Sequence, residues 1–316
     1  MEQRSRLGRN RPTQTHLNRM AEVIVLESRE RVLAGILFTA AAYFLFSAQD
    51  ASIKLLVAGM TVWQIMFVRS ITVLLACGAI GGKRLFADTI DSPIVRPMLV
   101  RSAFTLAAWL CYYNAARSLQ LAELTTIYYA APIIVTVLSV LILGETVPLL
   151  RWIAVFVGFV GVFIACDPTR LGLSVPVLLV LAAAVLWGIA VVLLRKTALQ
   201  ERTTIQLVLN NFYFLLFSAV PALLWWRMPD GTQLLLLLSV GALGGVAQYV
   251  LFEGMKRAPV SIVAPFEYTS LVWAFALGYA IWGDVPRTEV FMGAALIIGA
   301  GLLIVGNEHF RKREQA

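Results

Sequence analysis

The chain has 316 residues, of which 59% are hydrophobic and only 14% are charged, and its formal net charge is +8 at pH 7. An ordinary soluble domain carries roughly 25% charged residues, so this chain lacks the polar surface that a soluble enzyme of its size needs. Its high apolar content also excludes an intrinsically disordered chain. The basic residues cluster at the ends of apolar runs, which is typical of a membrane protein and not of a nucleic-acid-binding protein.

Histidine and cysteine form no pattern that would predict a metal site or a disulfide framework. The two histidines, His16 and His309, both lie outside the apolar runs, and Cys77, Cys111 and Cys166 are far apart. Zinc sites and disulfide-rich domains need closely spaced ligands or paired cysteines. We therefore expect no metal and no cofactor, and we interpret the cysteines as small packing residues.

Residues 1–31 are polar and contain seven arginines. No apolar segment follows the first arginines closely, so this stretch does not have the pattern of a cleavable signal peptide. We predict a flexible cytoplasmic tail. Met20 is an alternative start of the protein, and the sequence leaves that choice open.

From Val32 to Asn307 the chain alternates long apolar runs with short polar breaks. A helix that crosses the hydrocarbon core needs about 20 residues, and the continuous Leu, Ala and Gly runs lack the period-two alternation of a membrane barrel. We therefore predict an all-α polytopic membrane protein with ten transmembrane helices. The predicted spans are 33–53, 61–80, 98–115, 121–143, 150–166, 175–194, 205–226, 233–252, 260–282 and 289–307.

The distribution of Lys and Arg predicts the orientation, because cytoplasmic segments of membrane proteins are enriched in these residues. With the N-terminus inside, the inner segments carry 19 of them and the outer loops carry five, while Arg69 and Arg101 fall within spans. An even number of spans also returns the basic segment 308–316 to the inside. We therefore expect a multi-pass protein of a bacterial inner membrane with both termini in the cytoplasm.

The chain repeats itself at a spacing of about 140 residues, with few identities but in a consistent order. The matching segments are 40–54 with 182–196, 62–69 with 204–211, and 143–148 with 282–286. In the last pair, Glu145 corresponds to Asp284. Five spans in each half force the halves, 32–167 and 168–307, into opposite orientations. Such an inverted 5+5 repeat is typical of secondary transporters and predicts a site near the membrane midplane.

These features resemble the EamA-type transporters of the drug/metabolite transporter superfamily. The similarity rests on the spacing from Pro132 to Glu145, on the glycines within 158–163 and on an arginine in the second span, Arg69. It covers about residues 33–307. It implies ten helices, a central cavity shared by the two halves, and movement of a small organic solute.

The second half departs from this family pattern. Leu271 stands where the first half has Pro132, a proline occurs earlier at Pro265, and Asp284 replaces the usual glutamate. The two halves therefore need not line a cavity equally. The segment 264–284 is similar to bacterial importers of riboflavin and S-adenosylmethionine, so the resemblance implies riboflavin uptake first, with S-adenosylmethionine, amino acids or other metabolites, and export, as alternatives.

Charged residues within membrane spans are costly and are therefore candidate functional residues. Arg69 lies about 12 Å from the predicted outer end of its span, where it could clamp a substrate or form a structural pair. Glu267 follows Pro265, whose ring frees a backbone carbonyl. It is a candidate proton or cation site, or a partner of Arg69 or Tyr268.

Further candidates lie at helix ends and breaks. Asp50 and Lys54 are four residues apart, share one helix face and could pair, either as a solvated rim pair or as an outer gate. Glu123 could complement a helix N-terminus. Pro132 and Pro265 interrupt corresponding helices of the two halves, which points toward the site.

The remaining candidates are amide and aromatic side chains within the spans, which suit a planar, hydrogen-bonding solute. They are Gln64, Gln206, Asn210, Asn211, Trp109, Tyr128, Trp187 and Tyr268. Tyr112 fits an interfacial aromatic belt as well as a cavity.

The sequence thus favours a secondary transporter that moves a small, planar heterocyclic solute by alternating access. A membrane enzyme is a weaker alternative, because it would need clustered acids or histidines. A channel-like helper is another, but no ring of charges or repeated filter is visible. No nucleotide-binding loop occurs. The expected partners are the solute and the lipid bilayer, without nucleic acid; a homodimer remains an open question, as do the solute, the direction and the coupling ion.

Overall fold

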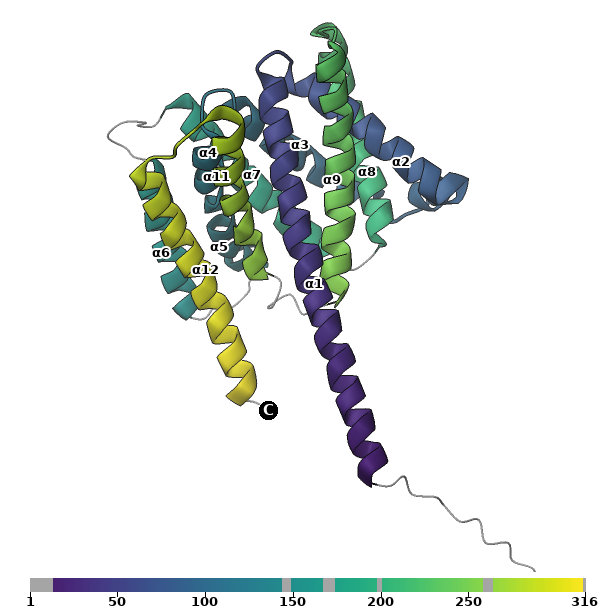
Figure 1. Ribbon diagram of the computed structural model, residues 1–316. Coiled ribbons are helices and arrows are strands. Elements are labelled where there is room, and N and C mark those ends of the chain that lie inside the picture. Colours follow the sequence, from purple (N-terminus) through teal and green to yellow (C-terminus); the bar gives the residue numbers. More distant parts are fainter. Residues whose placement is uncertain (1–13, 144–148, 167–173, 198–200, 258–263, 315–316) are drawn as a thin grey trace, which may run out of the picture.

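The computed structural model describes residues 14–143, 149–166, 174–197, 201–257 and 264–314. Every element in these segments is helical and none is a strand (Figure 1). The elements are α1 (Gln14–Val57), α2 (Val62–Ile90), α3 (Val95–Ala115), α4 (Leu121–Tyr128), α5 (Ala130–Leu143), α6 (Leu149–Cys166), α7 (Val175–Thr197), α8 (Thr203–Leu224), α9 (Gly231–Arg257), the 3₁₀ helix η1 (Ala264–Tyr268), α11 (Thr269–Trp282) and α12 (Thr288–Glu314).

The helices follow the ten predicted spans, which confirms the predicted fold class. The fourth span comprises α4 and α5, and the ninth comprises η1 and α11. Within the described segments, six spans are long and apolar enough to cross a membrane, and α6 and α12 contain shorter apolar stretches. By contrast, α3 carries Arg96 and Arg101, and α11 has only 14 residues.

Part of the predicted N-terminal tail is helical, since α1 begins at Gln14. No glycine or proline interrupts the chain between Gln14 and Gly35, so nothing in the sequence breaks the helix. Figure 1 shows this end of α1 extending beyond the rest of the bundle. The first 13 residues lie outside the described part.

The helix pairs obey the predicted inverted repeat. α1 packs along α9 and α3 along α7, while α2 packs on α8, α6 on α12 and α4 on α11. Replacing each helix by its counterpart in the other half converts the α1–α9 pair into the α7–α3 pair and leaves the other three pairs unchanged. This is the pattern expected of two halves related by a two-fold axis in the membrane plane.

Both interrupted spans break close to a proline. α4 ends at Tyr128 and α5 begins at Ala130, with Tyr129 between them outside helical geometry. Pro132 lies in the first turn of α5, where a missing N–H is tolerated. In the other half, Pro265 belongs to η1 and the α-helix resumes at Thr269.

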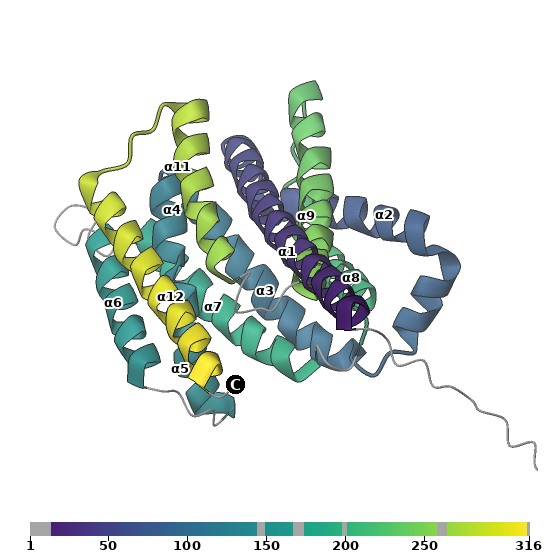
Figure 2. The same ribbon diagram turned by 60° about the horizontal axis from the view of Figure 1, so that its bottom comes forward.

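α2 contains a sharp turn at Gly82, whose φ of +58° lies in the left-handed region that favours glycine. The predicted span 61–80 ends just before this turn. The rest of α2 continues to Ile90 in a new direction, as Figure 2 shows. The turn therefore separates the spanning part of α2 from a short segment at its end.

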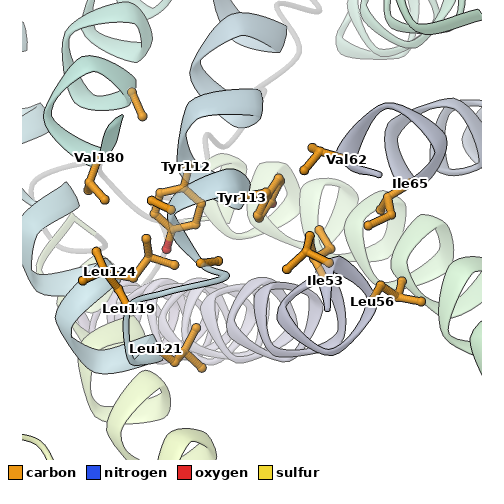
Figure 3. Close-up of a cluster of buried hydrophobic side chains, with 14 of the residues drawn as sticks. Ile53, Leu56, Val62, Ile65, Tyr112, Tyr113, Leu119, Leu121, Leu124 and Val180 are labelled. Atoms are coloured by element: carbon orange, nitrogen blue, oxygen red, sulfur yellow. The ribbon is translucent and has the colours of Figure 1, made fainter. Parts of the chain in front are cut away.

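The largest buried cluster lies beneath the loops that join α1 to α2 and α3 to α4. Figure 3 shows Tyr112 and Tyr113 of α3 among apolar side chains from α1, α2, α4 and α7. Tyr112 is buried, so its interpretation as an interfacial belt residue is wrong. The ring faces the interior because α3 is covered by α7 and α8.

Candidate functional site

The predicted outer end of the bundle is formed by the residues around 58–61, 116–120, 225–230 and 283–287. Here Lys54 Nζ donates a hydrogen bond to the Leu119 carbonyl (2.5 Å), lies 4.0 Å from the Asp284 carboxylate and sits over the Trp282 ring. No ion pair joins Lys54 to Asp50. The expected pair of Lys54 with Asp50 does not form, because the Lys54 ammonium group is bound by residues of neighbouring elements and does not turn back toward Asp50 on its own helix.

A second ion pair lies beside the first, with Arg287 Nη2 3.3 Å from Glu123 Oε1. Glu123 also accepts a bond from the Gln120 backbone N–H (3.2 Å), which confirms its predicted place at a helix N-terminus. Each ion pair joins the first half of the chain to the second. We call Lys54–Asp284 and Glu123–Arg287 the outer clasp. The sequence signalled Asp284 only through the repeated motif, and it gave no signal for Arg287.

Gln64 and Gln206 do not meet in the centre. Gln64 exchanges two hydrogen bonds with the backbone of Arg227 (2.7 and 3.0 Å) at the outer end. Gln206 donates to the Glu201 carbonyl (3.1 Å) at the start of α8, at the opposite end. The inverted repeat explains this separation, because corresponding residues are turned to opposite faces of the membrane.

Arg69 lies in the interior and is 3% exposed. Its Nη1 donates to Asn211 Oδ1 (3.2 Å), and its guanidinium lies 4.4 Å from the centre of the Trp109 ring. Arg69 and Asn211 are corresponding residues of the matched segments, so the two halves meet here. Next to Asn211, Asn210 accepts a bond from Ser102 (3.2 Å). Within the described part of the chain, Arg69 makes only this one hydrogen bond, although a guanidinium has five N–H donors.

Gly244 of α9 makes room for the Arg69 group. A methyl group at this position would overlap with the Gln49 amide oxygen and lie 3.1 Å from Arg69 Nη2. Gln49 is buried, and its amide oxygen has no hydrogen-bond partner among the described residues. Sequence analysis could not single out Gly244, because the run GALGG indicates only close helix packing.

Asp50 accepts a hydrogen bond from the Tyr113 hydroxyl (3.1 Å) and is half-buried. Tyr112, the neighbour of Tyr113, shares a hydrogen bond with the Thr125 hydroxyl (3.4 Å). Asp50 thus lies one helical turn before Lys54 of the outer clasp. Its carboxylate is hydrogen-bonded to Tyr113 of α3, and part of the residue's surface stays accessible. A carboxylate in this position can meet a solute or a proton within the bundle.

The two broken spans meet through tyrosines. The Tyr129 hydroxyl donates to the Glu267 backbone carbonyl (2.7 Å) and lies 2.5 Å from the Ser270 hydroxyl. The rings of Tyr129 and Tyr268 stack at 5.4 Å. The Glu267 carboxylate is half-buried and has neither a hydrogen bond nor an ion pair to another described residue. It does not pair with Arg69, which binds Asn211 instead.

An aromatic series joins the Arg69 region to the helix breaks. Tyr128 packs edge-on against Tyr112 with 4.9 Å between the ring centres. Trp187 of α7 is half-buried and packs against the cluster that contains Tyr129. The structure therefore places Tyr128, Trp187 and Tyr268 close to the junction of the two halves.

The described segments contain no group of three His, Cys, Asp or Glu side chains that could hold a metal ion. The three cysteines are free thiols. The chemistry that the site offers is therefore hydrogen bonding by Arg69, stacking on aromatic rings, and proton or cation binding by two carboxylates, Asp50 and Glu267.

The chain matches the EamA-like transporter family over residues 33–166 and again over residues 174–306. Each match covers one of the two halves described above. The match therefore extends over most of the chain and follows its internal repeat.

Among curated relatives, a riboflavin transporter of Vibrio cholerae is 28% identical over 254 residues, which covers 79% of this chain and 84% of the relative. An S-adenosylmethionine uptake transporter of Rickettsia prowazekii is 26% identical over 184 residues, covering 58% of this chain and 63% of the relative. One crystal structure superposes with a TM-score of 0.59 at 20% identity, over 87% of this chain and 96% of the other. At that identity, the structural likeness establishes the fold alone.

Proposed function

The chain belongs to the EamA-like transporter family, and on that premise we propose that it carries a small organic metabolite across the bacterial inner membrane by alternating access. The observation that carries the proposal is the meeting of corresponding residues from the two halves, Arg69 with Asn211 and Tyr129 with Tyr268, inside the bundle. A transporter built from inverted halves binds its solute at such an interface.

The chemistry around Arg69 favours a planar heterocycle as the solute. The guanidinium has N–H donors that no described residue accepts, and the Nε donor is buried. Trp109, Tyr113 and Tyr128 supply aromatic faces within the same region. A ring system with carbonyl acceptors, such as the isoalloxazine of riboflavin, would accept bonds from Arg69 and stack on these rings. Uptake of riboflavin is therefore our first candidate activity.

S-adenosylmethionine is the second candidate, and the acidic residues favour it. Asp50 and Glu267 are half-buried carboxylates, and neither forms an ion pair with a described residue. A solute with a sulfonium and an ammonium group would complement two such charges. With a neutral solute such as riboflavin, the same carboxylates are available to bind the coupling proton, and Glu267 is our candidate for that role.

Growth and uptake measurements distinguish these solutes. In a riboflavin auxotroph without its own importer, expression of this chain should restore growth at low riboflavin, and membrane vesicles should accumulate labelled riboflavin. Labelled S-adenosylmethionine is offered to the same vesicles. Accumulation of S-adenosylmethionine alone would replace the first candidate by the second, and accumulation of neither would reject both.

Glu267→Gln tests the proposed coupling residue. The amide keeps the shape of the side chain but cannot release a proton, so we expect normal amounts of protein in the membrane and loss of concentrative uptake. Exchange of labelled for unlabelled solute, which needs no net proton movement, should persist. Concentrative uptake at the rate of the unaltered protein would remove Glu267 from the mechanism.

The proposed orientation, with both termini in the cytoplasm, is checked with reporter fusions. A C-terminal fluorescent protein that matures only in the cytoplasm should fluoresce, and an alkaline phosphatase fusion at the same position should be inactive. An active phosphatase would overturn both the orientation and the even number of spans.

A further inference from the structure

Two tyrosines at corresponding positions of the two halves have different partners. In the register that matches Glu145 with Asp284, Tyr129 corresponds to Tyr268 and Tyr128 corresponds to Glu267. The Tyr129 hydroxyl donates to the backbone carbonyl of Glu267 (2.7 Å). The counterpart of this bond would run from the Tyr268 hydroxyl to the backbone carbonyl of Tyr128.

That counterpart bond is not formed in this conformation. The Tyr268 hydroxyl has no hydrogen-bond partner among the described residues, and its ring lies against Gly301 of α12, where a methyl group would overlap with it. The Tyr129 and Tyr268 rings nevertheless stack at 5.4 Å with their planes 29° apart. Both hydroxyls thus belong to the same junction between the broken spans, and only one of them is used.

The carbonyl of Tyr128 lacks its regular helical donor as a consequence of the sequence. In an α-helix the carbonyl of Tyr128 would accept a bond from the N–H of residue 132, but Pro132 has no N–H. A carbonyl that has lost its regular helical donor can accept a bond from another group, and no side chain of the described residues donates to this one. Tyr128 therefore offers a carbonyl that the Tyr268 hydroxyl could satisfy.

The outer clasp indicates which conformation the structure represents. Lys54–Asp284 and Glu123–Arg287 join the two halves at the predicted outer end, so this end is closed. In an inverted repeat, the opposite conformation arises when the two halves exchange their local geometries. The result is equivalent to the first conformation seen from the other side of the membrane, so the opposite end is then closed.

We propose that Tyr129 and Tyr268 exchange roles during transport. When the outer end is closed, Tyr129 donates to the Glu267 carbonyl; when the outer end opens, Tyr129 releases it and Tyr268 donates to the carbonyl of Tyr128. Both are positioning residues that stabilise one conformation each. This inference rests on the proposed alternating access but not on the identity of the solute.

The exchange is not fully symmetric. Ser270 contributes a hydroxyl 2.5 Å from that of Tyr129, whereas the corresponding residue of the first half is Ala131. The outer-closed conformation therefore has one hydrogen bond more at this junction than its counterpart. The extra bond favours the outer-closed conformation in the absence of solute.

Accessibility of a single cysteine tests the exchange without any solute. The reporter is Thr125→Cys, which is buried beneath the outer clasp, in a chain whose three native cysteines are replaced by alanine. A membrane-impermeant maleimide is added from outside. Lys54→Ala is included in every variant to weaken the clasp and give an intermediate rate of labelling.

In this background, Tyr129→Phe should raise the labelling rate and Tyr268→Phe should lower it. Loss of one buried hydrogen bond shifts an equilibrium between two conformations about twofold to tenfold. Tyr279→Phe, which removes an exposed hydroxyl from α11, is the matched control and should leave the rate unchanged. Protein amount and size-exclusion profile in detergent check that each variant folds.

Labelling rates that change in the same direction in both phenylalanine variants, or that do not change in Tyr268→Phe, would overturn the exchange. The assay also separates this proposal from the proposed function. Opposite shifts in a protein that accumulates neither riboflavin nor S-adenosylmethionine would support the exchange and reject only the solutes. Normal uptake of one of these solutes, together with unchanged labelling, would support the proposed function and reject the exchange.

Discussion

Arg69 is a buried cation whose geometry limits what can replace it. It is planar, lies over Trp109 and donates to Asn211. Burial of an unpaired charge is expensive, and here the aromatic face and the amide oxygen offset only part of the cost. The remaining donors are the reason to expect a solute or a water molecule at this position.

Arg69→Lys tests this geometry. The ammonium group keeps the charge but cannot stack on Trp109 or present a planar set of donors. Loss of a hydrogen bond to a charged group costs about 1.5–3 kcal/mol, so solute affinity should fall about tenfold to a hundredfold. The measurement is the KM of uptake, normalised to protein in the membrane. An unchanged KM would show that only the charge of Arg69 is used.

Gly244→Ala tests the positioning of the same group from the opposite side. The added methyl group would overlap with the Gln49 amide and press on Arg69 Nη2. Displacing packed side chains costs about 1–3 kcal/mol, and we expect a higher KM for uptake with little change in protein amount. Gly245→Ala is the control, because its methyl group would lie 3.8 Å from Val73, in ordinary contact. Equal effects of the two variants would contradict a role for Gly244 in positioning Arg69.

At the scale of elements, helix contacts in this fold depend on small residues. α6 and α12 approach so closely that a methyl group at Gly293 would lie 2.5 Å from the carbonyl oxygen of Gly161 and 2.8 Å from Ala165 Cβ. Membrane helices gain stability from such close packing because lipid provides no hydrophobic driving force between them. The α6–α12 pair joins the two halves at one edge of the bundle (Figure 1).

Gly293→Ala should therefore destabilise the protein by forcing α6 and α12 apart, with an overpacking cost of about 1–3 kcal/mol. We expect a lower midpoint of thermal aggregation in detergent. Gly299 lies on the same helix, and a methyl group added there would have no neighbour within 4 Å. The aggregation midpoint of Gly299→Ala should therefore match that of the unaltered protein. A Gly293→Ala variant as stable as its control would mean that the two helices can separate without cost.

At the scale of the whole molecule, the two halves are joined at the predicted outer end by charged side chains and in the interior by Arg69–Asn211 and the tyrosine pair. Surface ion pairs contribute only about 0–1 kcal/mol each, whereas these lie in partly buried positions. Two such pairs are weak enough to open during the proposed transport cycle and strong enough to bias the resting conformation.

Charge reversal tests the clasp. Lys54→Asp places two carboxylates together and should open the outer end, which raises labelling of the Thr125→Cys reporter by an external maleimide. The double variant Lys54→Asp, Asp284→Lys recreates an ion pair of the opposite sense and should lower labelling again. Labelling that stays high in the double variant would indicate that Lys54 acts through its bond to the Leu119 carbonyl and not through Asp284.

The sequence by itself determined the class of protein, the spans and the inverted repeat. These follow from composition, from the length of apolar runs and from an odd number of spans per half, and none of them depends on how side chains meet. It also marked Arg69 and Glu267 as unusual, because charges within spans are costly wherever they lie. Pro132 and Pro265 marked the two broken helices for an equally local reason.

Only the tertiary structure decided which residues meet. Lys54 binds Asp284 and not Asp50, Gln64 and Gln206 lie at opposite ends, and Gly244 proves to be the neighbour of Arg69. The physical reason is that these contacts join segments up to about 230 residues apart, through helix pairings that cross between the halves. Local periodicity specifies which face of a helix is apolar, but it carries no information about which helix will cover that face.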